Sequence, residues 1–509
     1  MTRSLSRVKF WLLVLYVPHV LHTVHSAGGS KLPNILFLLA DDFGWYDVGY
    51  HNPKIQTPNI DKLAKSGVIL DSYYVQPICT PTRGALMTGR YPIHTGLQHD
   101  VIHPENPYGL PLDFDLLPQK LKQAGYATHL VGKWHLGFYK WPYVPTKRGF
   151  DSAYGFWDGS EDHFDHSRLG IVDFRDNLDV VKNLNGTYAT NAYVSQVKKV
   201  LQDHNSSQPL FMYMAFQNVH APIQAPEKYI EKYEFIENRM RRVHAAMADI
   251  MDEAVGNITE AFKEAGLWEN TLLIFSTDNG GLPFYGGYNW PLRGEKMTLW
   301  EGGVRGVGFV HGNKLARKGV TCNELLHVTD WYPTILGLAG VTSVDKSPIP
   351  LDGHDVWDTI SMGKPSPRTE ILLNIDQPGS VPPGPGVLGG YTGIALRTGD
   401  MKLLMNVPNV TWFKPPEIGG KVEKEIPLDA VFENPDMVTV DKVDIALYNI
   451  SKDPEERVDL SKKFPDIVKE MQMRVKYFVN SSVKPLYQKN DPEALKTAQE
   501  KGAWGPWRD

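Results

Sequence analysis

Cysteine is scarce in this chain, which contains only Cys79 and Cys322 among 509 residues. With two thiols, at most one disulfide can form, and a structural zinc site built on thiolates is not expected. Either the two cysteines pair with each other, or at least one of them is kept for chemistry. The net charge is also small, at -5, so the charge balance indicates neither nucleic acid nor an anionic membrane as a partner.

Long apolar runs are missing too, except near the start of the chain. Residues 1–26 are typical of a signal peptide, with basic residues followed by the apolar run Phe10–Val20 and small residues up to Ser26. The alternative is an uncleaved anchor, but eleven residues interrupted by Pro18 are too few to cross a bilayer comfortably. We therefore expect a protein of the secretory pathway, lysosomal or extracellular, without stable membrane insertion.

Six Asn-x-Ser/Thr sequons agree with this expectation and predict an N-glycosylated protein. A single sequon often arises by chance, whereas six behind a signal peptide support one another. They lie at Asn185, Asn205, Asn257, Asn409, Asn449 and Asn480.

Strands and helices alternate through the first two thirds of the chain. The apolar runs that predict buried strands are Asn34–Ala40, Thr128–Trp134, Phe211–Phe216 and Leu272–Asp278. Helical spacing appears between them at Asn59–Val68, Leu116–Ala124 and Arg241–Ala265. This order predicts an α/β fold with a large, mostly parallel sheet sandwiched by helices.

The length of the chain exceeds what one hydrophobic core usually supports, so we expect two domains. The larger one is predicted at residues 27–370 and a smaller α+β domain at 371–509. Within the latter, Gln377–Gly390 predicts a loop rich in Pro and Gly, and short strands are expected at Tyr391–Leu396 and Lys402–Asn406. A final helix near Pro465–Phe478 carries its apolar residues on one stripe.

Polar residues stand at or just beyond the end of each of the four predicted strands. In chain order they are Asp41 and Asp42, Lys133 and His135, His220, and Asp278 and Asn279. Because ligand sites in open α/β sheets lie at the carboxyl ends of the strands, we expect these side chains to meet at one edge. For any single pair, the alternative is an ordinary polar residue at a strand end. Three carboxylates and an amide would together suit a hard cation such as calcium or magnesium.

A second group of metal-ligating residue types lies at His163, Asp165 and His166. Its spacing matches no standard metal site. We therefore interpret this segment as a solvated loop.

The segment Cys79–Pro92 contains a Cys-x-Pro-x-Arg core followed by a Thr-Gly-Arg block, and Gly125–Gly137 contains Gly-Lys-Trp-His-Leu-Gly. Together with Ile35–Asp42 and Ser276–Gly281, these segments resemble the type I sulfatase family over almost the whole mature chain. The chain is similar to the arylsulfatase B group through Asn218–Pro222 and Leu292–Gly306. Position 82 is Thr, where family members most often carry Ser.

The resemblance implies an alkaline-phosphatase-like fold and a formylglycine made from Cys79 by a formylglycine-generating enzyme of the endoplasmic reticulum. It implies one calcium ion per chain, held by Asp41, Asp42, Asp278 and Asn279, with the modified Cys79 completing the shell. It also implies that Arg83 lies against the modified residue and that Lys133, His135, His220 and Lys296 surround the sulfate. Vertebrate relatives use several disulfides, which this chain cannot form.

The implied reaction is hydrolysis of a sulfate monoester. One hydroxyl of the formylglycine hydrate attacks sulfur and forms a covalent sulfate ester, and the second lets the aldehyde re-form as sulfate leaves. His220 or Lys296 would protonate the leaving alcohol, and His135 would act as the base. The implied substrate is the 4-sulfated N-acetylgalactosamine end of a glycosaminoglycan, with small dietary or plant sulfate esters as the alternative. Loops such as His99–Leu112 and Phe156–Asp176 are expected to build the substrate pocket.

Two other kinds of protein fit part of this pattern. A phosphatase or phosphodiesterase of the same superfamily would share the strand-end metal sites, but would use Ser or Thr as nucleophile, usually with two zinc ions. A catalytically dead glycan-binding protein would keep the fold and could show a disulfide between Cys79 and Cys322. The Cys-x-Pro-x-Arg setting argues against the first, and the filled catalytic positions argue against the second.

Overall fold

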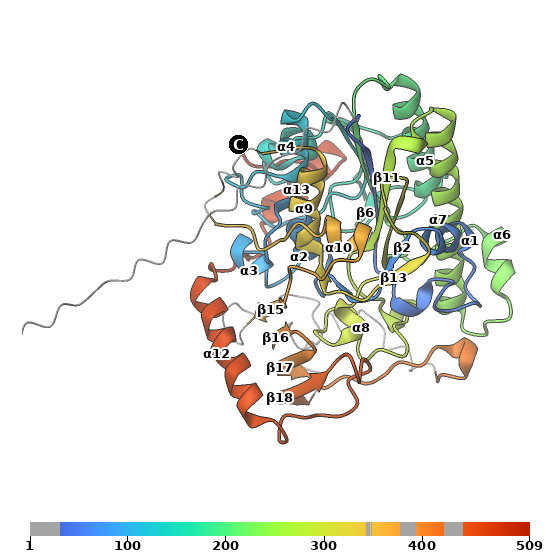
Figure 1. The fold of residues 1–509 in the computed structure, drawn as a ribbon. Helices are drawn as coiled ribbons and strands as arrows, with labels where there is room; N and C mark the ends of the chain where they lie inside the picture. Colours follow the sequence, from blue (N-terminus) through green and yellow to red (C-terminus); the bar gives the residue numbers. More distant parts are fainter. Residues whose placement is uncertain (1–30, 343–346, 348, 377–392, 422–440) are drawn as a thin grey trace, which may run out of the picture. The chain divides into compact units, whose positions relative to one another are not determined.

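Five parallel strands form the centre of the main sheet in the computed structural model (Figure 1). In spatial order they are β11 (Thr271–Thr277), β1 (Asn34–Ala40), β10 (Leu210–Ala215), β4 (Ala127–Gly132) and β5 (Ser152–Gly155). Within the part of the chain that the structure describes, the sheet has ten strands, and β11 is followed at one edge by β12 (Gly308–Gly312), β2 (Val68–Leu70) and β13 (Val320–Cys322). At the other edge lie β8 (Arg175–Asp176) and β9 (Asp179–Val180). Neighbouring strands pair in antiparallel orientation at four places: β11–β12, β12–β2, β5–β8 and β8–β9.

The structure describes residues 31–342, 347, 349–376, 393–421 and 441–509. The predicted signal peptide at 1–26 and the predicted loop Gln377–Gly390 lie outside these residues, as does the start of the predicted strand Tyr391–Leu396. Residues Leu32–Asp509 form one compact unit, and a division of the chain at residue 370 remains a prediction. Among the described helices, none combines the length and apolar character that a membrane crossing requires.

The central strands are apolar on both faces because each face supports its own core. Side chains alternate along a strand, so Ile35, Phe37 and Leu39 of β1 enter one core and Leu36 and Leu38 enter the other. One core is covered by α2 (Cys79–Thr88), α4 (Leu117–Gln123), α9 (Trp331–Leu338) and α13 (Pro492–Lys501). The other is covered by α1 (Pro58–Lys65), α5 (Ala189–Asp203) and α7 (Arg239–Glu264). The predicted helix-sandwiched sheet is confirmed (Figure 1).

A second, antiparallel sheet of four strands makes up the predicted α+β part near the C-terminus. Its strands are β15 (Glu370–Asp376), β16 (Gly393–Thr398), β17 (Met401–Pro408) and β18 (Lys442–Asn449). Helix α12 (Pro465–Ser481) packs on it through Met471, Val475 and Phe478. These three residues recur every three or four positions, which is the apolar stripe that the sequence predicted.

Shorter elements connect these layers. The helices are α3 (Pro92–Thr95), α6 (Glu227–Ile230), α8 (Glu301–Val304) and α10 (Trp357–Met362). Two small ladders pair β3 (Tyr73–Tyr74) with β14 (Leu326–His327), and β6 (Ser167–Arg168) with β7 (Ile171–Val172). Of these elements, α8 bears most directly on the site, because it follows the loop that carries Lys296.

Candidate active site and metal site

Four neighbouring parallel strands deliver the predicted polar residues to one edge of the main sheet. Asp41 and Asp42 follow β1, Asp278 and Asn279 follow β11, Lys133 and His135 follow β4, and His220 lies beyond β10. Because β11, β1, β10 and β4 are adjacent and parallel, their carboxyl ends lie side by side. The structure therefore brings all seven residues of the strand-end prediction into one region.

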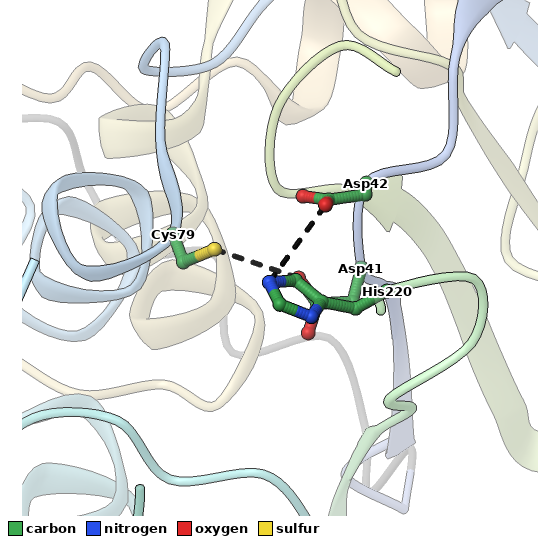
Figure 2. Close-up of side chains that lie close together, drawn as sticks. All are labelled: Asp41, Asp42, Cys79 and His220. Carbon is green, nitrogen blue, oxygen red and sulfur yellow. Dashed lines mark hydrogen bonds and ion pairs between the residues drawn. The ribbon is translucent and has the colours of Figure 1, made fainter. Parts of the chain in front are cut away.

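Cys79 meets this edge from the helix layer, as the first residue of α2. Its Sγ lies 3.5 Å from Asp41 Oδ1. Possible ligand atoms of Asp41, Asp42, Cys79 and His220 all lie within 4.8 Å of one another (Figure 2). Cys79 and Cys322 are both free thiols, so the disulfide that would mark a non-catalytic homologue is not formed between them.

Buried ion pairs connect the site, and three of them are at hydrogen-bond distance. Lys133 Nζ lies 2.6 Å from Asp41 Oδ2, and Arg83 Nη2 lies 2.8 Å from Asp278 Oδ2. The third pair joins Lys296 Nζ to Asp42 Oδ2 at 2.8 Å. Buried charges are tolerated when they are paired in this way, so three carboxylates and three cations can share one water-poor region.

The oxygen atoms of the site fit a hard cation. Asp41 and Asp278 are fully buried and Asp42 is 4% exposed. Asn279 donates from Nδ2 to Asp42 Oδ1 at 2.8 Å, while its Oδ1 is buried and finds no hydrogen-bond partner within the described parts of the chain. An amide oxygen left without a partner beside three carboxylates is a donor set that suits calcium. Asp41, Asp42, Asp278 and Asn279 are thus the residues that would hold the ion.

Burial and the neighbouring cations set the protonation states. Burial raises the pKa of the Cys79 thiol, so the thiol stays protonated at neutral pH and is a weak nucleophile. Burial, followed by the charge of Lys133, lowers the pKa of His135 well below its usual value. Burial and Lys296 lower the pKa of His220 to about 3. Burial and the nearby Asp41 raise the pKa of Asp278 to about 6. Both imidazoles are therefore neutral in the site as it stands.

Three residues in or next to the site have a left-handed backbone. Asp42, His135 and Met297 have φ angles of 59°, 56° and 74°. Residues other than glycine rarely adopt this left-handed conformation, which costs about 1–3 kcal/mol unless the surroundings enforce it. Two of the three are predicted site residues, and Met297 follows Lys296, so the contacts of the site maintain a strained backbone at these positions.

Several contacts that position the site were not predicted from the sequence. Thr80 Oγ1 donates to the carbonyl of His135 at 3.0 Å, and His135 Nε2 lies 3.0 Å from the carbonyl of Ile102. Thr82 Oγ1 donates to the carbonyl of Asp278 and accepts from the backbone N–H of Gln76. Both threonines occupy variable positions of the Cys-x-Pro-x-Arg core. Since serine has the same hydroxyl, Thr82 can make the contacts expected of the more common residue.

The interpretation of His163, Asp165 and His166 as a solvated loop is wrong for the two histidines. Asp165 is exposed, but His163 is fully buried and His166 is 2% exposed. His163 stacks on Tyr188, and His166 Nδ1 lies 3.3 Å from Glu161. The histidines are buried because each finds such a partner in the core.

Comparison with known proteins agrees with this geometry. A family model described as "Sulfatase" matches residues 33–341. The chain is 46% identical to arylsulfatase J of Mus musculus over 494 residues, which cover 95% of this chain and 81% of the relative. It is 32% identical to N-acetylgalactosamine-6-sulfatase of Homo sapiens over 366 residues, 67% of this chain and 68% of the relative.

Among solved structures, the chain resembles the crystal structure of Ps i-CgsB in complex with k-i-k-neocarrahexaose. The TM-score is 0.75 and the sequence identity 27%, over 93% of this chain and 98% of the other. This likeness agrees with the alkaline-phosphatase-like arrangement expected from the sequence.

We predict that calcium stabilises the folded protein through the four oxygen-bearing residues. At a concentration one hundred times the Kd, the ion should add about 2.7 kcal/mol to the free energy of unfolding. Chelation should lower the thermal midpoint, and Asp42→Asn should remove most of the response. Differential scanning fluorimetry with and without calcium, together with metal analysis, would measure both effects.

Asp252→Asn is the matched control, because this buried carboxylate accepts hydrogen bonds from Asn59 and Ile60 away from the site. It should lower stability and leave the calcium response intact. Equal midpoints of the native protein with and without calcium would contradict the metal site.

Proposed function

The chain belongs to the sulfatase family, and we propose that it removes sulfate from a sulfated sugar, using as nucleophile a formylglycine made from Cys79. As a sulfatase it is a sulfuric ester hydrolase. The observation that carries the proposal is the position of Cys79 at the start of α2, 3.5 Å from Asp41 and within 4.8 Å of the possible ligand atoms of Asp42 and His220.

The chemistry of position 79 supports its modification. A buried thiol with a raised pKa is a weak nucleophile, and thiolate sulfur is a poor ligand for calcium. Formylglycine hydrate would supply a hydroxyl nucleophile and an oxygen ligand in the same place. The formylglycine-generating enzyme would then be a partner during maturation, and Thr82 would preserve the hydroxyl contacts of the loop.

The cations of the site would bind the sulfate group. A sulfate ester is anionic, so Lys133, Lys296 and Arg83 can neutralise its oxygens and the charge that develops during transfer. Calcium would add Lewis acidity at the same oxygens. Tight mutual packing of these side chains leaves little room for water, which strengthens each electrostatic interaction.

His220 and Lys296 are placed to give the leaving alcohol its proton. His220 Nδ1 lies 2.6 Å from the carbonyl of Ala221, so this nitrogen serves as the donor there. The other ring nitrogen, Nε2, faces Asp42 at 3.8 Å (Figure 2). With the proton of the neutral ring on Nδ1, Nε2 can give a proton only after it has gained one. We therefore assign Nζ of Lys296, or Nε2 of His220 in its doubly protonated form, as the proton donor, and His135 as the base of the second step.

The substrate we propose is the 4-sulfated N-acetylgalactosamine end of a glycosaminoglycan. One relative is by name an N-acetylgalactosamine-6-sulfatase, and a structural neighbour was crystallised with a neocarrahexaose. Both support a sulfated sugar without selecting the position of the sulfate. Small dietary or plant sulfate esters remain the second candidate, because the buried core requires only a sulfate monoester.

We also propose that the protein is N-glycosylated in the secretory pathway and acts in the lysosome or outside the cell. Five of the six sequon asparagines are exposed in the structure: Asn185, Asn205, Asn257, Asn409 and Asn480. Asn449 is half-buried, and its Nδ2 contacts Met401 Sδ at 3.6 Å. An oligosaccharide would therefore have access to the other five sites.

We predict that the peptide carrying residue 79 has the mass of formylglycine in secreted, active protein. Cys79→Ala should abolish turnover, because it removes the nucleophile, and should leave secretion largely intact. Peptide mass spectrometry of the same digest supplies a control at Cys322, a buried thiol on β13 that should remain unmodified. An unmodified thiol at position 79 in fully active protein would refute the mechanism.

His220→Gln should lower kcat/KM mainly for substrates with poor leaving groups. An activated aryl alcohol scarcely needs a proton, whereas an alkyl or sugar alcohol does, and general acid catalysis contributes about 10²–10⁴-fold. Steady-state rates on a series of esters of graded leaving-group pKa would show a steeper dependence in the variant. His311→Gln, on β12 away from the site, is the control. Equal losses on all esters would mean that the role of His220 is misassigned.

A substrate panel should rank terminal 4-sulfated N-acetylgalactosamine above 6-sulfated N-acetylgalactosamine, steroid sulfates and plant sulfate esters. Hydrolysis of activated aryl sulfates is expected in every case. If the sulfated sugars trail the other esters by about a hundredfold in kcat/KM, equivalent to about 2.7 kcal/mol, the glycosaminoglycan assignment falls while the sulfatase assignment stands.

A further inference from the structure

Four charged side chains form a cluster in the two loops that the sequence analysis assigned to the substrate pocket. Asp100 and His103 belong to the first loop, and Asp158 and Arg168 belong to the second. We call them the rim cluster. His103 and Asp158 are separated by more than fifty positions in the chain, yet the charge of Asp158 acts on His103, so the fold brings them together.

The rim cluster lies directly beside the active site. Val101, next to Asp100, packs against Cys79, and the carbonyl of Ile102 lies 3.0 Å from His135 Nε2. In the second loop, the residue after Asp158 is Gly159, which packs against His135. A Cβ added at Gly159 would lie 2.8 Å from the imidazole ring. The same two loop segments therefore contact the reacting centre and carry the rim cluster.

The charged groups of the cluster lie in pairs, but the facing atoms are too far apart to form good hydrogen bonds with each other. His103 Nε2 lies 3.5 Å from Asp100 Oδ2, and Arg168 Nε lies 3.4 Å from Asp158 Oδ2. Both separations exceed an ordinary charge-assisted hydrogen bond. Each of these four atoms is shielded from solvent and forms no hydrogen bond within the described residues. Buried polar atoms normally have a partner, so four such atoms side by side indicate that a ligand supplies it.

Other contacts hold the side chains of the cluster in this arrangement. Asp100 Oδ1 accepts from the backbone N–H of Val101 at 2.7 Å, and Arg168 Nη1 donates to Ser160 Oγ at 3.0 Å. The side chains of Asp100 and Asp158 are only 4% and 2% exposed. The unsatisfied atoms are therefore fixed by their neighbours and are not mobile surface groups.

We propose that the rim cluster binds two hydroxyl groups of the sugar ring whose sulfate is hydrolysed, an inference that rests on the proposed function. Each hydroxyl can donate to a carboxylate oxygen and accept from the facing nitrogen of His103 or Arg168. Burial alone would lower the pKa of His103, but the facing carboxylate of Asp100 raises it, which favours the donor form of the imidazole. The cluster offers acceptor oxygens and donor nitrogens in equal number, which suits hydroxyl groups because a hydroxyl both donates and accepts.

The test compares two esters on the full-length secreted enzyme. kcat/KM is measured for 4-sulfated N-acetylgalactosamine and for 4-nitrophenyl sulfate, which has no sugar ring. The ratio of kcat/KM for the sugar ester to kcat/KM for the aryl ester should fall by about tenfold to a hundredfold in Asp100→Asn, Asp158→Asn and Arg168→Gln. Asp179→Asn, an exposed carboxylate on β9, should keep the native ratio. If Asp158→Asn fails to fold, Arg168→Gln preserves the test, because the Arg168 side chain is 38% exposed.

A second readout uses sugar sulfates that each lack one ring hydroxyl. In the native enzyme, kcat/KM should be about tenfold lower for the analogue without the recognised hydroxyl than for the complete sugar sulfate. In Asp158→Asn the two substrates should have the same kcat/KM, because the hydroxyl and the carboxylate act in one contact and their losses do not add. Equal losses on both esters, or an unchanged ratio, would overturn the subsite. If the native enzyme cleaves the aryl ester but no sugar sulfate, the subsite falls and the sulfatase function stands. Cleavage of neither ester would refute the proposed function, and the subsite with it.

Discussion

The neutralisation of buried charge is the constraint on which this site depends. Asp41, Asp42 and Asp278 lie almost fully out of water, and an unpaired carboxylate there would be strongly destabilising. Four adjacent strand ends, the first turn of α2 and the Lys296 loop must therefore meet within hydrogen-bond distance. The left-handed backbone at Asp42 and His135 lies at two of these strand ends, where the surrounding contacts must enforce it.

Similar buried ion clusters connect distant segments of this chain, whose two cysteines form no disulfide. Lys402 of β17 contacts Glu301 and Glu456, each at 2.9 Å, and all three side chains are fully buried. Glu301 begins α8, so this cluster ties the small sheet to the loop that carries Lys296. On the opposite core, Arg241 binds Glu417 at 2.7 Å. Removal of one partner from such a cluster typically costs about 3–5 kcal/mol, which compares with the loss of a disulfide.

The sequence predicted those parts of the molecule that depend on local patterns. The boundaries predicted for β1, β4, β10 and β11 were correct to within about two residues. A short apolar run between two helical segments is typical of a buried strand, so the local pattern is sufficient there. The strand-end residues converged as expected, since parallel strands share an edge. The edge strands β2, β12 and β13 were not predicted, because they are short and their pairing partners are distant in the sequence. The contacts of Thr80 and Ile102 with His135 join separate loops, and no local pattern encodes such contacts.

The charges of the site also favour a sulfate ester over a phosphate ester. Three carboxylates face three cations, and burial keeps His135 and His220 neutral. A calcium ion would add two positive charges, which a singly charged sulfate monoester and one ionised nucleophile would balance. A doubly charged phosphate monoester would leave one negative charge uncompensated in a region that water scarcely reaches, at a cost of several kcal/mol. The number of buried charges in this site would therefore favour a sulfate ester independently of the identity of residue 79.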